Sequence, residues 1–439
     1  MNANWRAIIR WLSPGMRVKR WILVALLSMG FVVVAILYAI GTDIVRFVYR
    51  ALPSAHSIRY LILACACALG AFGFFFSLFR LMRSVAGGVA PDARIRASTM
   101  IYRTRRLNRG PRVVAIGGGT GLSTLLRGLK EETSNLTAVV TVMDDGGSSG
   151  RLREEIDVLP PGDVRNCLLA LAEDETQLSD FFQYRFSSPQ ELAGHSLGNL
   201  ILAGLEQATG GFDRAIEAMS HFLNIRGRVL PATLAKTNLV ATMEDGTRVE
   251  GESRLVADPR RIVTLSLTTS PVPAYETVLA ALSEADLIIL GPGSLFTSLI
   301  PNLLVEGIAA RIEEAAAEKL LISNLMTQPG ETDGLTLSDH LSVLNEYVNL
   351  RRFDAILVNE TEPDRGLLVG YIDEHASPVV DDLANPRPYG LDILRADLVG
   401  TAPWAGKQTI KHDPAKLARV IVRQTQTFRS ARRGRRPTP

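Results

Sequence analysis

Cysteine and histidine are scarce in this 439-residue chain, which has three cysteines and six histidines. Cys65, Cys67 and Cys167 form no paired C-x-x-C pattern, so the sequence offers no cysteine-based metal centre. We expect all three to be reduced packing residues, as in a reducing compartment around the main domain. No clear nucleophile and no histidine–acid pair stand out, so the sequence gives no signature of covalent catalysis.

An internal repeat and a strong overall charge of one sign are also missing. The formal net charge is only +3, and positive charge gathers at the two ends of the chain. Residues 1–20 contain no acid, and residues 429–439 are rich in arginine. This distribution does not indicate a nucleic-acid partner, and we predict none.

Hydrophobic residues, by contrast, make up 47% of the chain, and the mean hydropathy of +0.14 is high for a soluble protein. Two uncharged apolar runs, residues 22–40 and 60–79, are each about 20 residues long, enough to span a bilayer as a helix. A cleaved signal peptide is a poor alternative for the first run, because the apolar stretch is too long and a second one follows. Buried core helices are the other alternative.

Arginine and lysine flank the two runs on their outer sides and are few in the loop between them. The positive-inside rule then places both ends in the cytoplasm. We therefore predict a two-span protein of the cell membrane, with a hairpin in the lipid bilayer and a cytoplasmic main domain. The basic segment after the second run either lies against anionic headgroups or is simply solvated. The predicted parts are a membrane anchor (1–82), a basic linker (83–110), an α/β domain (111–428) and a basic disordered tail (429–439).

From Pro111 onward, short apolar runs that end in polar or glycine turns alternate with helical segments. Runs that are apolar on both faces suit the central strands of a parallel sheet covered by helices. We predict a doubly wound, mostly parallel Rossmann-like α/β fold, preceded by two transmembrane helices. The predicted strands lie in residues 112–119, 136–143, 261–268, 285–293, 319–326 and 353–360. Residues 234–255 alternate around Asp245-Gly246 instead, which predicts a small antiparallel hairpin.

The stretch VVAIGGGTGLSTLL, residues 113–126, places three glycines between a strand and a helix. Glycine permits a sharp turn and a close approach to a ligand, and the helix start offers free N–H groups to an anion. The pattern is neither a strict G-x-G-x-x-G nor a Walker A loop. It indicates phosphate or nucleotide binding, with a tight packing turn as the alternative. The candidate residues are Gly117, Gly118, Gly119, Thr120, Gly121 and Leu122.

The stretch VTVMDDGGSSGRL ends the next apolar strand in Asp144 and Asp145. The two acids can bind a ribose, or an Mg²⁺ ion that bridges to phosphate; a hydrated acidic turn is the third possibility. If the protein is an enzyme, these acids are its candidate catalytic residues. Backbone amides and hydroxyls of the following residues can close over a ligand: Gly146, Gly147, Ser148 and Ser149.

Two further motifs carry polar residues near helix starts. In LPPGDVRN, Asp163 is a suitable N-cap for a helix that begins at the next residue, and Arg165 and Asn166 can then face a cleft. In GHSLGNL, His195 and Asn199 are four residues apart and share a face if that turn is helical. Catalysis, ligand contact and a structural role all stay open for this pair.

Two later strands end in the polar loops GPGSLFTS and SNLMTQPG. Their hydroxyl and amide groups can bind a phosphate or a sugar near a helix start. The candidates are Gly291, Gly293, Ser294, Thr297, Asn324 and Thr327. Open α/β sheets bind ligands at the carboxyl ends of their strands, so we expect these loops to meet the two earlier ones in a single cleft.

Together these motifs resemble those of the bacterial gluconeogenesis factor family, which is similar in turn to the 2-phospho-L-lactate transferases of coenzyme F420 biosynthesis. The resemblance spans residues 111–422 and rests on GGGTGLSTLLRGLK, VTVMDDGGSSGRLREE, LPPGDVRNCLLALA, GHSLGNLIL, ADLIILGPGSLFTSLIPNLLV and NLMTQPGET. The first family implies a nucleotide-sugar-binding regulator associated with cell shape and envelope precursor supply. The transferases imply Mg²⁺-dependent transfer of a phospholactyl group from a guanosine diphosphate carrier to a deazaflavin. Soluble gluconeogenesis factors often carry a tyrosine where Leu335 stands and an arginine where Ser377 stands, both implicated in nucleotide-sugar contact.

The motifs and the resemblance predict a membrane-tethered protein that binds a nucleotide or nucleotide-sugar and regulates carbon metabolism, cell shape or envelope synthesis. A Mg²⁺-dependent transferase of a phosphate-ester group is the alternative hypothesis. Envelope-synthesis proteins and a second copy of the chain are the macromolecular partners that the first hypothesis suggests.

Overall fold

The computed structural model describes residues 24–30, 32, 65, 68–80, 106–372, 375–383, 388–404 and 407–434. The chain divides into two compact units, Met1–Arg103 and Thr104–Pro439. In the first unit, residues 24–30 and 68–80 are helical, and a Cβ added to Gly73 would lie 2.6 Å from the Ser28 hydroxyl oxygen. No helix in the described part of the chain has both the length and the apolar character to cross a membrane. Parts of both predicted spans, and most of the predicted linker, lie outside the described residues.

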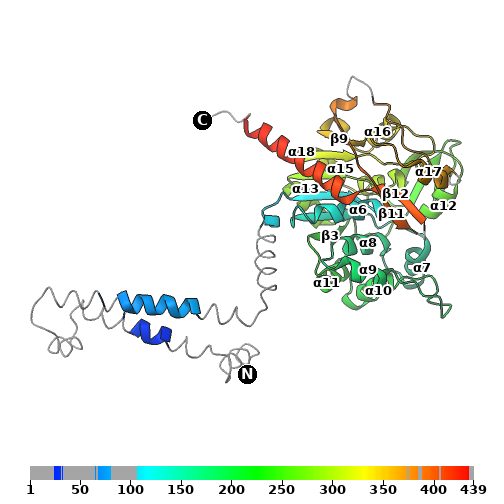
Figure 1. Ribbon diagram of the computed structural model, residues 1–439. Helices are drawn as coiled ribbons and strands as arrows, with labels where there is room; N and C mark the ends of the chain where they lie inside the picture. The colour runs from blue at the N-terminus through cyan, green and yellow to red at the C-terminus, as the bar shows by residue number, and fades with distance from the viewer. Residues whose placement is uncertain are drawn as a thin grey trace, which may run out of the picture. The chain divides into compact units, whose positions relative to one another are not determined.

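Seven parallel strands form the central sheet of the second unit, in the order β10-β9-β8-β7-β1-β2-β3. Figure 1 labels β3 and β9 of this sheet. The strands are β1 Val113–Gly117, β2 Leu136–Val140, β3 Arg228–Pro231, β7 Leu287–Leu290, β8 Glu318–Ile322, β9 Ala355–Asn359 and β10 Asp392–Ala396. The predicted parallel, doubly wound α/β fold is confirmed for this unit. Strand β1 lies between β2 and β7. The strands on its β2 side come earlier in the sequence than the strands on its β7 side.

The sheet separates two hydrophobic cores, and alternate side chains of one strand enter different cores. In β1, Val113 and Ala115 belong to one core, and Val114 and Ile116 belong to the other. Helices α6 Gly119–Leu129, α8 Gly162–Leu171, α11 Phe212–Phe222 and α18 Pro414–Gly434 cover the first core. Helices α13 Glu276–Glu284, α15 Ile308–Glu314 and α16 Leu337–Asn345 cover the second. Burial of both faces explains why the central strands are continuously apolar in sequence.

A three-stranded antiparallel sheet, in the order β5-β4-β6, contributes to the second core. Its strands are β4 Leu239–Met243, β5 Arg248–Glu250 and β6 Ile262–Leu267. The predicted hairpin is therefore confirmed, with Gly246 at a φ of +81° in its turn. The prediction that residues 261–268 belong to the main sheet is wrong. Val263 is 49% exposed, so β6 buries little of one face despite its apolar sequence.

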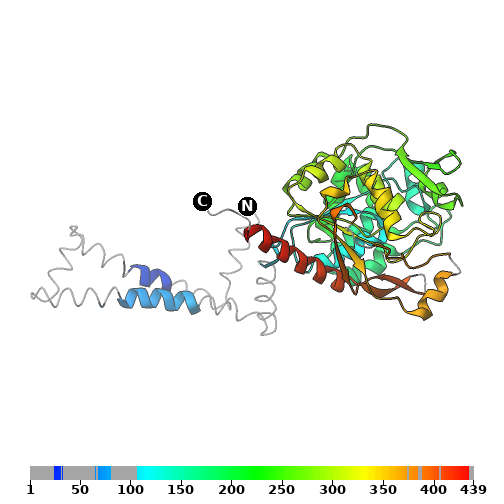
Figure 2. The same cartoon turned by 90° about the horizontal axis from the view of Figure 1, so that it is seen from above.

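A hairpin and a long helix end the described chain. The hairpin pairs β11 Val399–Trp404 with β12 Lys407–His412. Helix α18 packs on α6, and its far end extends past the sheet (Figure 2). Since α18 continues to Gly434, the first part of the tail predicted to be disordered is helical. The other elements are α7 Gly147–Ile156, α9 Glu175–Gln183, α10 Leu197–Thr209, α12 Glu252–Ala257, α14 Ile300–Leu303, α17 Arg365–Ile372, η1 Leu295–Leu299, η2 Leu350–Arg352 and η3 Pro388–Gly390.

Candidate functional site

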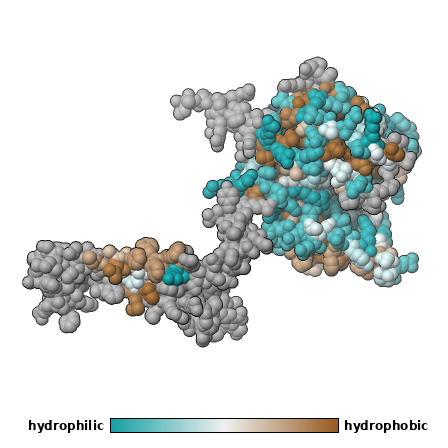
Figure 3. Space-filling view, in the orientation of Figure 1, coloured by the Kyte–Doolittle hydropathy of each residue, from teal (hydrophilic) through white to brown (hydrophobic). Residues whose placement is uncertain are grey.

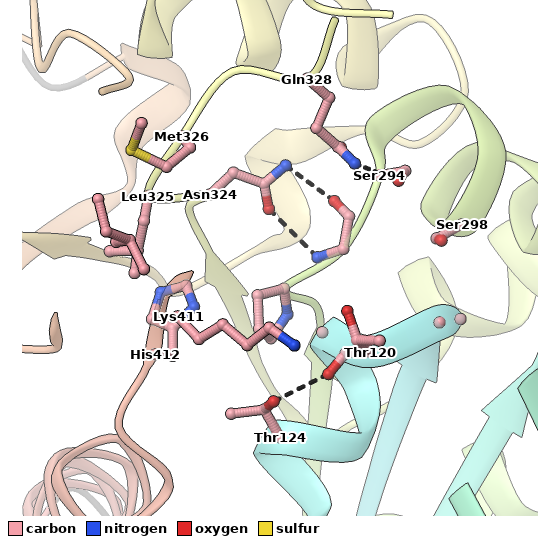
Figure 4. A pocket seen from close by; sticks show the side chains of 16 residues that line it. Thr120, Thr124, Ser294, Ser298, Asn324, Leu325, Met326, Gln328, Lys411 and His412 are labelled. Carbon is pink, nitrogen blue, oxygen red and sulfur yellow. Dashed lines mark hydrogen bonds between the residues drawn. The ribbon is translucent and has the colours of Figure 1, made fainter. Parts of the chain in front are cut away.

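A cavity of about 200 Å³ opens at the carboxyl ends of β1, β7 and β8, where the strand order changes direction. Doubly wound sheets bind ligands at such a switch point. Figure 4 shows this cavity between the start of α6, the loops after β7 and β8, and the end of β12. Its lining includes the predicted residues Gly118, Gly119, Thr120, Gly121, Gly293, Ser294 and Asn324. Three of the four predicted loops therefore meet, while the loop after β2 does not line this cavity.

The glycine turn after β1 requires glycine at two positions. Gly119 has a φ of +58°, a left-handed conformation that side chains disfavour. A Cβ on Gly121 would lie 2.2 Å from the Pro292 carbonyl oxygen, so this glycine lets α6 touch the β7 loop. The first turn of α6 contains no acid, and Gly118 caps the helix without a side-chain hydrogen bond. The positive end of the helix dipole is thus available to an anion in the cavity.

Two amide side chains of the β8 loop fix the β7 loop opposite the glycine turn. Asn324 accepts a hydrogen bond from the Gly293 N–H at 3.2 Å and donates one to the Gly293 carbonyl oxygen at 2.8 Å. Gln328 donates to the Ser294 hydroxyl at 2.6 Å, as Figure 4 also shows. Ser298 of η1, which was not predicted, lines the same wall. The two serine hydroxyls are thus placed to donate to a phosphate or a sugar.

Strand β12 supplies two further cavity residues that the motifs did not indicate, Lys411 and His412. Lys411 extends toward Thr120 at the start of α6 (Figure 4). His412 is 8% exposed, and its Nε2 atom has no hydrogen-bond partner among the described residues. Burial lowers the pKa of His412 to about 4, so the ring is neutral at physiological pH. No sequence motif indicates either residue, because their hairpin lies far from the glycine turn along the chain.

Asp163 is a site residue whose position was predicted wrongly. Helix α8 begins at Gly162, so Asp163 lies inside the first turn instead of capping a helix that starts after it. Its carboxylate accepts a hydrogen bond from the Gly119 N–H, and a Cβ on Gly118 would lie 2.6 Å from its Oδ2. Burial and the nearby Asp144 raise the pKa of Asp163 to about 7. This carboxyl group therefore exchanges its proton near neutral pH beside the glycine turn.

The two adjacent acids after β2 have different partners. Asp144 accepts the Gly146 N–H at 2.8 Å, and burial raises its pKa. Asp145 accepts the Ser253 N–H at 2.8 Å, at the start of α12. Neither acid lines the cavity at the glycine turn. The two acids therefore have separate backbone partners, and Asp144 is the one whose charge affects Asp163.

The acids meet the requirements of a Mg²⁺ ion in part. Within the described residues, no group of three or more His, Cys, Asp or Glu side chains is arranged to hold a metal. Mg²⁺ is, however, usually held by one or two carboxylates together with ligand phosphates and water. Burial first, and the charge of Asp145 next, disfavour the ionised form of Asp144. A cation would stabilise that form, so Asp144 fits the role of a single carboxylate ligand.

Ser148, Arg165, His195 and Asn199 form a buried network beside the start of α7. Ser148 Oγ lies 3.0 Å from His195 Nδ1 and accepts a hydrogen bond from Asn199 Nδ2 at 3.1 Å. Asn199 Oδ1 accepts in turn from Arg165 Nη1 at 2.8 Å. His195 precedes α10, so it does not share a helix face with Asn199. Instead, both side chains contact the Ser148 hydroxyl. With Ser148 6% and His195 1% exposed, the arrangement favours a structural role.

The remaining predicted site residues form hydrogen bonds that hold the loops after the strands, or lie within these loops and the helices that follow them. Thr297 donates to Glu331 at 3.2 Å, and burial raises the pKa of Glu331 to about 7. The Thr327 N–H donates to the Ser377 carbonyl oxygen at 2.7 Å. The others are Gly117 at the end of β1, buried Leu122 in α6, Gly291 with a φ of +129°, Gly146, Gly147 and Ser149 around the start of α7, and Asn166 in α8.

These features define a doubly wound α/β protein with a polar cleft at its strand-order switch point. The family model of 2-phospho-L-lactate transferase CofD matches residues 113–399. A Bacillus subtilis protein named "Gluconeogenesis factor" is 45% identical over 316 residues, which cover 72% of this chain and 98% of that protein. A Nostoc sp. protein of the same family name is 43% identical over 430 residues, which cover 94% of this chain and 92% of that protein.

A solved structure from Bacillus halodurans agrees with these matches. It has a TM-score of 0.68 and 45% identity, and the similarity covers 72% of this chain and 100% of that one. The chain belongs to the gluconeogenesis factor family, within the group that the transferase model describes.

Proposed function

We propose that this protein binds a nucleotide or nucleotide-sugar at the glycine turn, and that binding regulates carbon metabolism, cell shape or envelope synthesis. The start of α6 carries the proposal. Its first turn after Gly119, the positive end of its dipole and the side chain of Lys411 line one cavity. The hydroxyls of Ser294 and Ser298 add donors on the opposite wall. Phosphate groups are the ligand chemistry that this set of donors suits best.

Thermal unfolding of the full-length protein with nucleoside diphosphates and nucleotide-sugars tests the proposal. A ligand at 100 times its Kd stabilises the folded state by about 2.7 kcal/mol, which raises the melting temperature by several degrees. Gly119→Ala should abolish this rise, because it disturbs the turn that presents the N–H groups. Gly246→Ala is the matched control, since both glycines have a positive φ and Gly246 lies in a hairpin elsewhere. Equal stabilisation of both variants by ligand would contradict the proposal.

A Mg²⁺-dependent transferase of a phosphate-ester group is the second candidate. The match to the 2-phospho-L-lactate transferase model and the acids beside the glycine turn favour it. Asp144, with Asp145, would hold the ion, which supplies charge neutralisation at phosphate oxygens. Asp163 would accept or donate a proton near neutral pH. Steady product formation with Mg²⁺ that is lost in Asp144→Asn supports this candidate, whereas stabilisation by ligand without turnover supports the regulator.

We further propose that the first unit tethers the protein to the cell membrane, with the α/β unit in the cytoplasm. Its described residues are mainly apolar (Figure 3), and Leu69 and Phe72 are 75% and 71% exposed. The close approach of Gly73 to Ser28 is of the small-residue type common between membrane helices. The Nostoc relative also aligns over 94% of this chain, so the match extends into this unit. A tether would hold the binding site beside envelope-synthesis proteins.

A further inference from the structure

A second cavity, of about 620 Å³, opens between α6, α8 and the β11–β12 hairpin. It adjoins the cavity at the glycine turn, because Thr120, Thr124, Lys411 and His412 line both. Four cationic side chains contribute to its wall: Arg127, Arg165, Arg185 and Lys411. These come from α6, α8, the segment after α9, and β12, so the fold gathers them from four separate stretches of sequence.

The described residues that line this cavity include fewer acids than cations. Among the described residues that line it, Asp413 is the one acid, and its Oδ1 already accepts the Lys416 N–H at 2.8 Å. Arg127 forms an ion pair with Glu175, which does not line the cavity. Arg185 donates to a neutral acceptor, the Gly194 carbonyl oxygen, at 2.8 Å. Of the described residues that line the cavity, four are thus arginine or lysine and one is an acid.

Arg165 is the most deeply buried cationic side chain of this wall. It is 8% exposed, and its Nε atom has no hydrogen-bond partner among the described residues. Burial, and then the charge of Arg185, lower the pKa of Arg165 to about 10. Burial and the charge of Arg127 also lower the pKa of Lys411. Buried and mutually repelling cations are stabilised when an anion lies between them.

We propose that this cavity is a second anion site, which binds a phosphate group separately from the glycine turn. The group belongs either to a free phosphorylated small molecule or to the far end of the ligand held at the glycine turn, since the two cavities adjoin. The site does not require that a nucleotide binds, because three of its cations, Arg127, Arg165 and Arg185, do not line the cavity at the glycine turn.

Calorimetric titration of inorganic phosphate and pyrophosphate into the full-length protein tests the site. Arg185→Gln should weaken binding of these probes about tenfold, the usual effect of losing one charge-assisted hydrogen bond. Lys411→Gln should weaken it similarly. Arg214→Gln is the control, because Arg214 is an exposed arginine of α11 that donates to the Thr209 carbonyl oxygen outside the cavity. Unchanged affinity in both cavity variants would overturn the proposal.

A second titration identifies the source of the phosphate. If inorganic phosphate competes with a nucleoside diphosphate but not with the monophosphate, the site holds the terminal phosphate of a single ligand. If phosphate and the diphosphate bind together, the site takes a separate phosphorylated molecule. If no nucleotide binds while phosphate binding stays sensitive to Arg185→Gln, the proposed nucleotide function fails and the anion site stands.

Discussion

The carboxylate of Asp163 lies so close to Gly118 that a Cβ on this glycine would be 2.6 Å from Oδ2. A carboxyl group that can carry a negative charge therefore lies beside the turn that is suited to phosphate. Two like charges cannot share this space at low cost, so a bound phosphate favours either the protonated acid or a cation beside it. The pKa of about 7 places Asp163 at the point where both states are accessible.

Asp163→Asn should flatten the dependence of stability on pH. The folded-state pKa of about 7 lies above the ordinary value of 3.8, so the native state binds more protons between these values. Stability from this group is present at acidic pH and is lost as pH rises toward 7. Asparagine keeps an acceptor for the Gly119 N–H but cannot ionise. Chemical unfolding at pH 5 and pH 8 should show a loss of stability that is smaller in the variant, by on the order of 2 kcal/mol.

Two comparisons make the pH experiment specific. Asp180→Asn, at an exposed position of α9, should leave the wild-type slope unchanged. Glu331→Gln should remove a further part of the slope in the same direction, because burial raises the pKa of Glu331 to about 7 as well. A wild-type slope in Asp163→Asn would show that the acid is not protonated in the folded protein near neutrality.

Gly121→Ala should destabilise the protein, because its methyl group meets the Pro292 carbonyl oxygen at 2.2 Å. Overpacking against backbone typically costs roughly 1–3 kcal/mol. Gly204→Ala is the matched control: this glycine lies within α10 with nothing within 4 Å of an added Cβ. Alanine there should stabilise the helix by about 0.5–1 kcal/mol. Opposite shifts in melting temperature are expected, and a gain in both variants would exclude close packing at the turn.

The glycine turn and most of the parallel sheet were predictable because each depends on local sequence. Continuous apolar runs mark strands that are buried on both faces, and the loops that follow them collect at one edge. The prediction that residues 261–268 belong to the main sheet is wrong, because their apolar sequence forms a strand with one exposed face. It also missed β3 and β10, which lie at the edges of the sheet and need no long apolar run.

The cavity residues that were not predicted were missed for a different reason. Lys411, His412 and Arg185 belong to no motif, and only the folding of distant segments onto α6 and α8 brings them to the ligand-binding edge. For Asp163 the sequence predicts a helix cap, because an acid after proline and glycine is typical of helix starts. Its true position depends on α8 beginning two residues earlier than predicted, at Gly162, a detail that sequence patterns resolve poorly.

Asn199→Ala should lower the free energy of unfolding by more than the loss of side-chain volume alone would. The amide joins Ser148 to Arg165 in a buried network, and its removal takes one hydrogen bond from each of them. Ser148 keeps its contact with His195, and Arg165 keeps its hydrogen bond to Ser196. Loss of the two bonds should cost roughly 0.5–3 kcal/mol each, with the larger value for the bond from the charged arginine. Asn238→Ala is the control, because the Asn238 amide donates to an exposed Glu250 carboxylate. Chemical unfolding should show a clear loss for the first variant and little for the second; equal losses would contradict a structural role for the network.

The proposed membrane tether predicts how the protein partitions in cell extracts. The full-length chain should remain with the membrane fraction after a high-salt wash, because salt screens only the electrostatic part of binding. Detergent should release it. A variant that lacks Met1–Arg103, the first compact unit, should leave the membrane fraction without detergent. The Bacillus subtilis relative matches 72% of this chain over 98% of its own length, so it provides a natural comparison for the shortened form. Release of the full-length protein by salt alone would exclude an inserted hairpin and leave a peripheral, charge-dependent attachment through the basic segments.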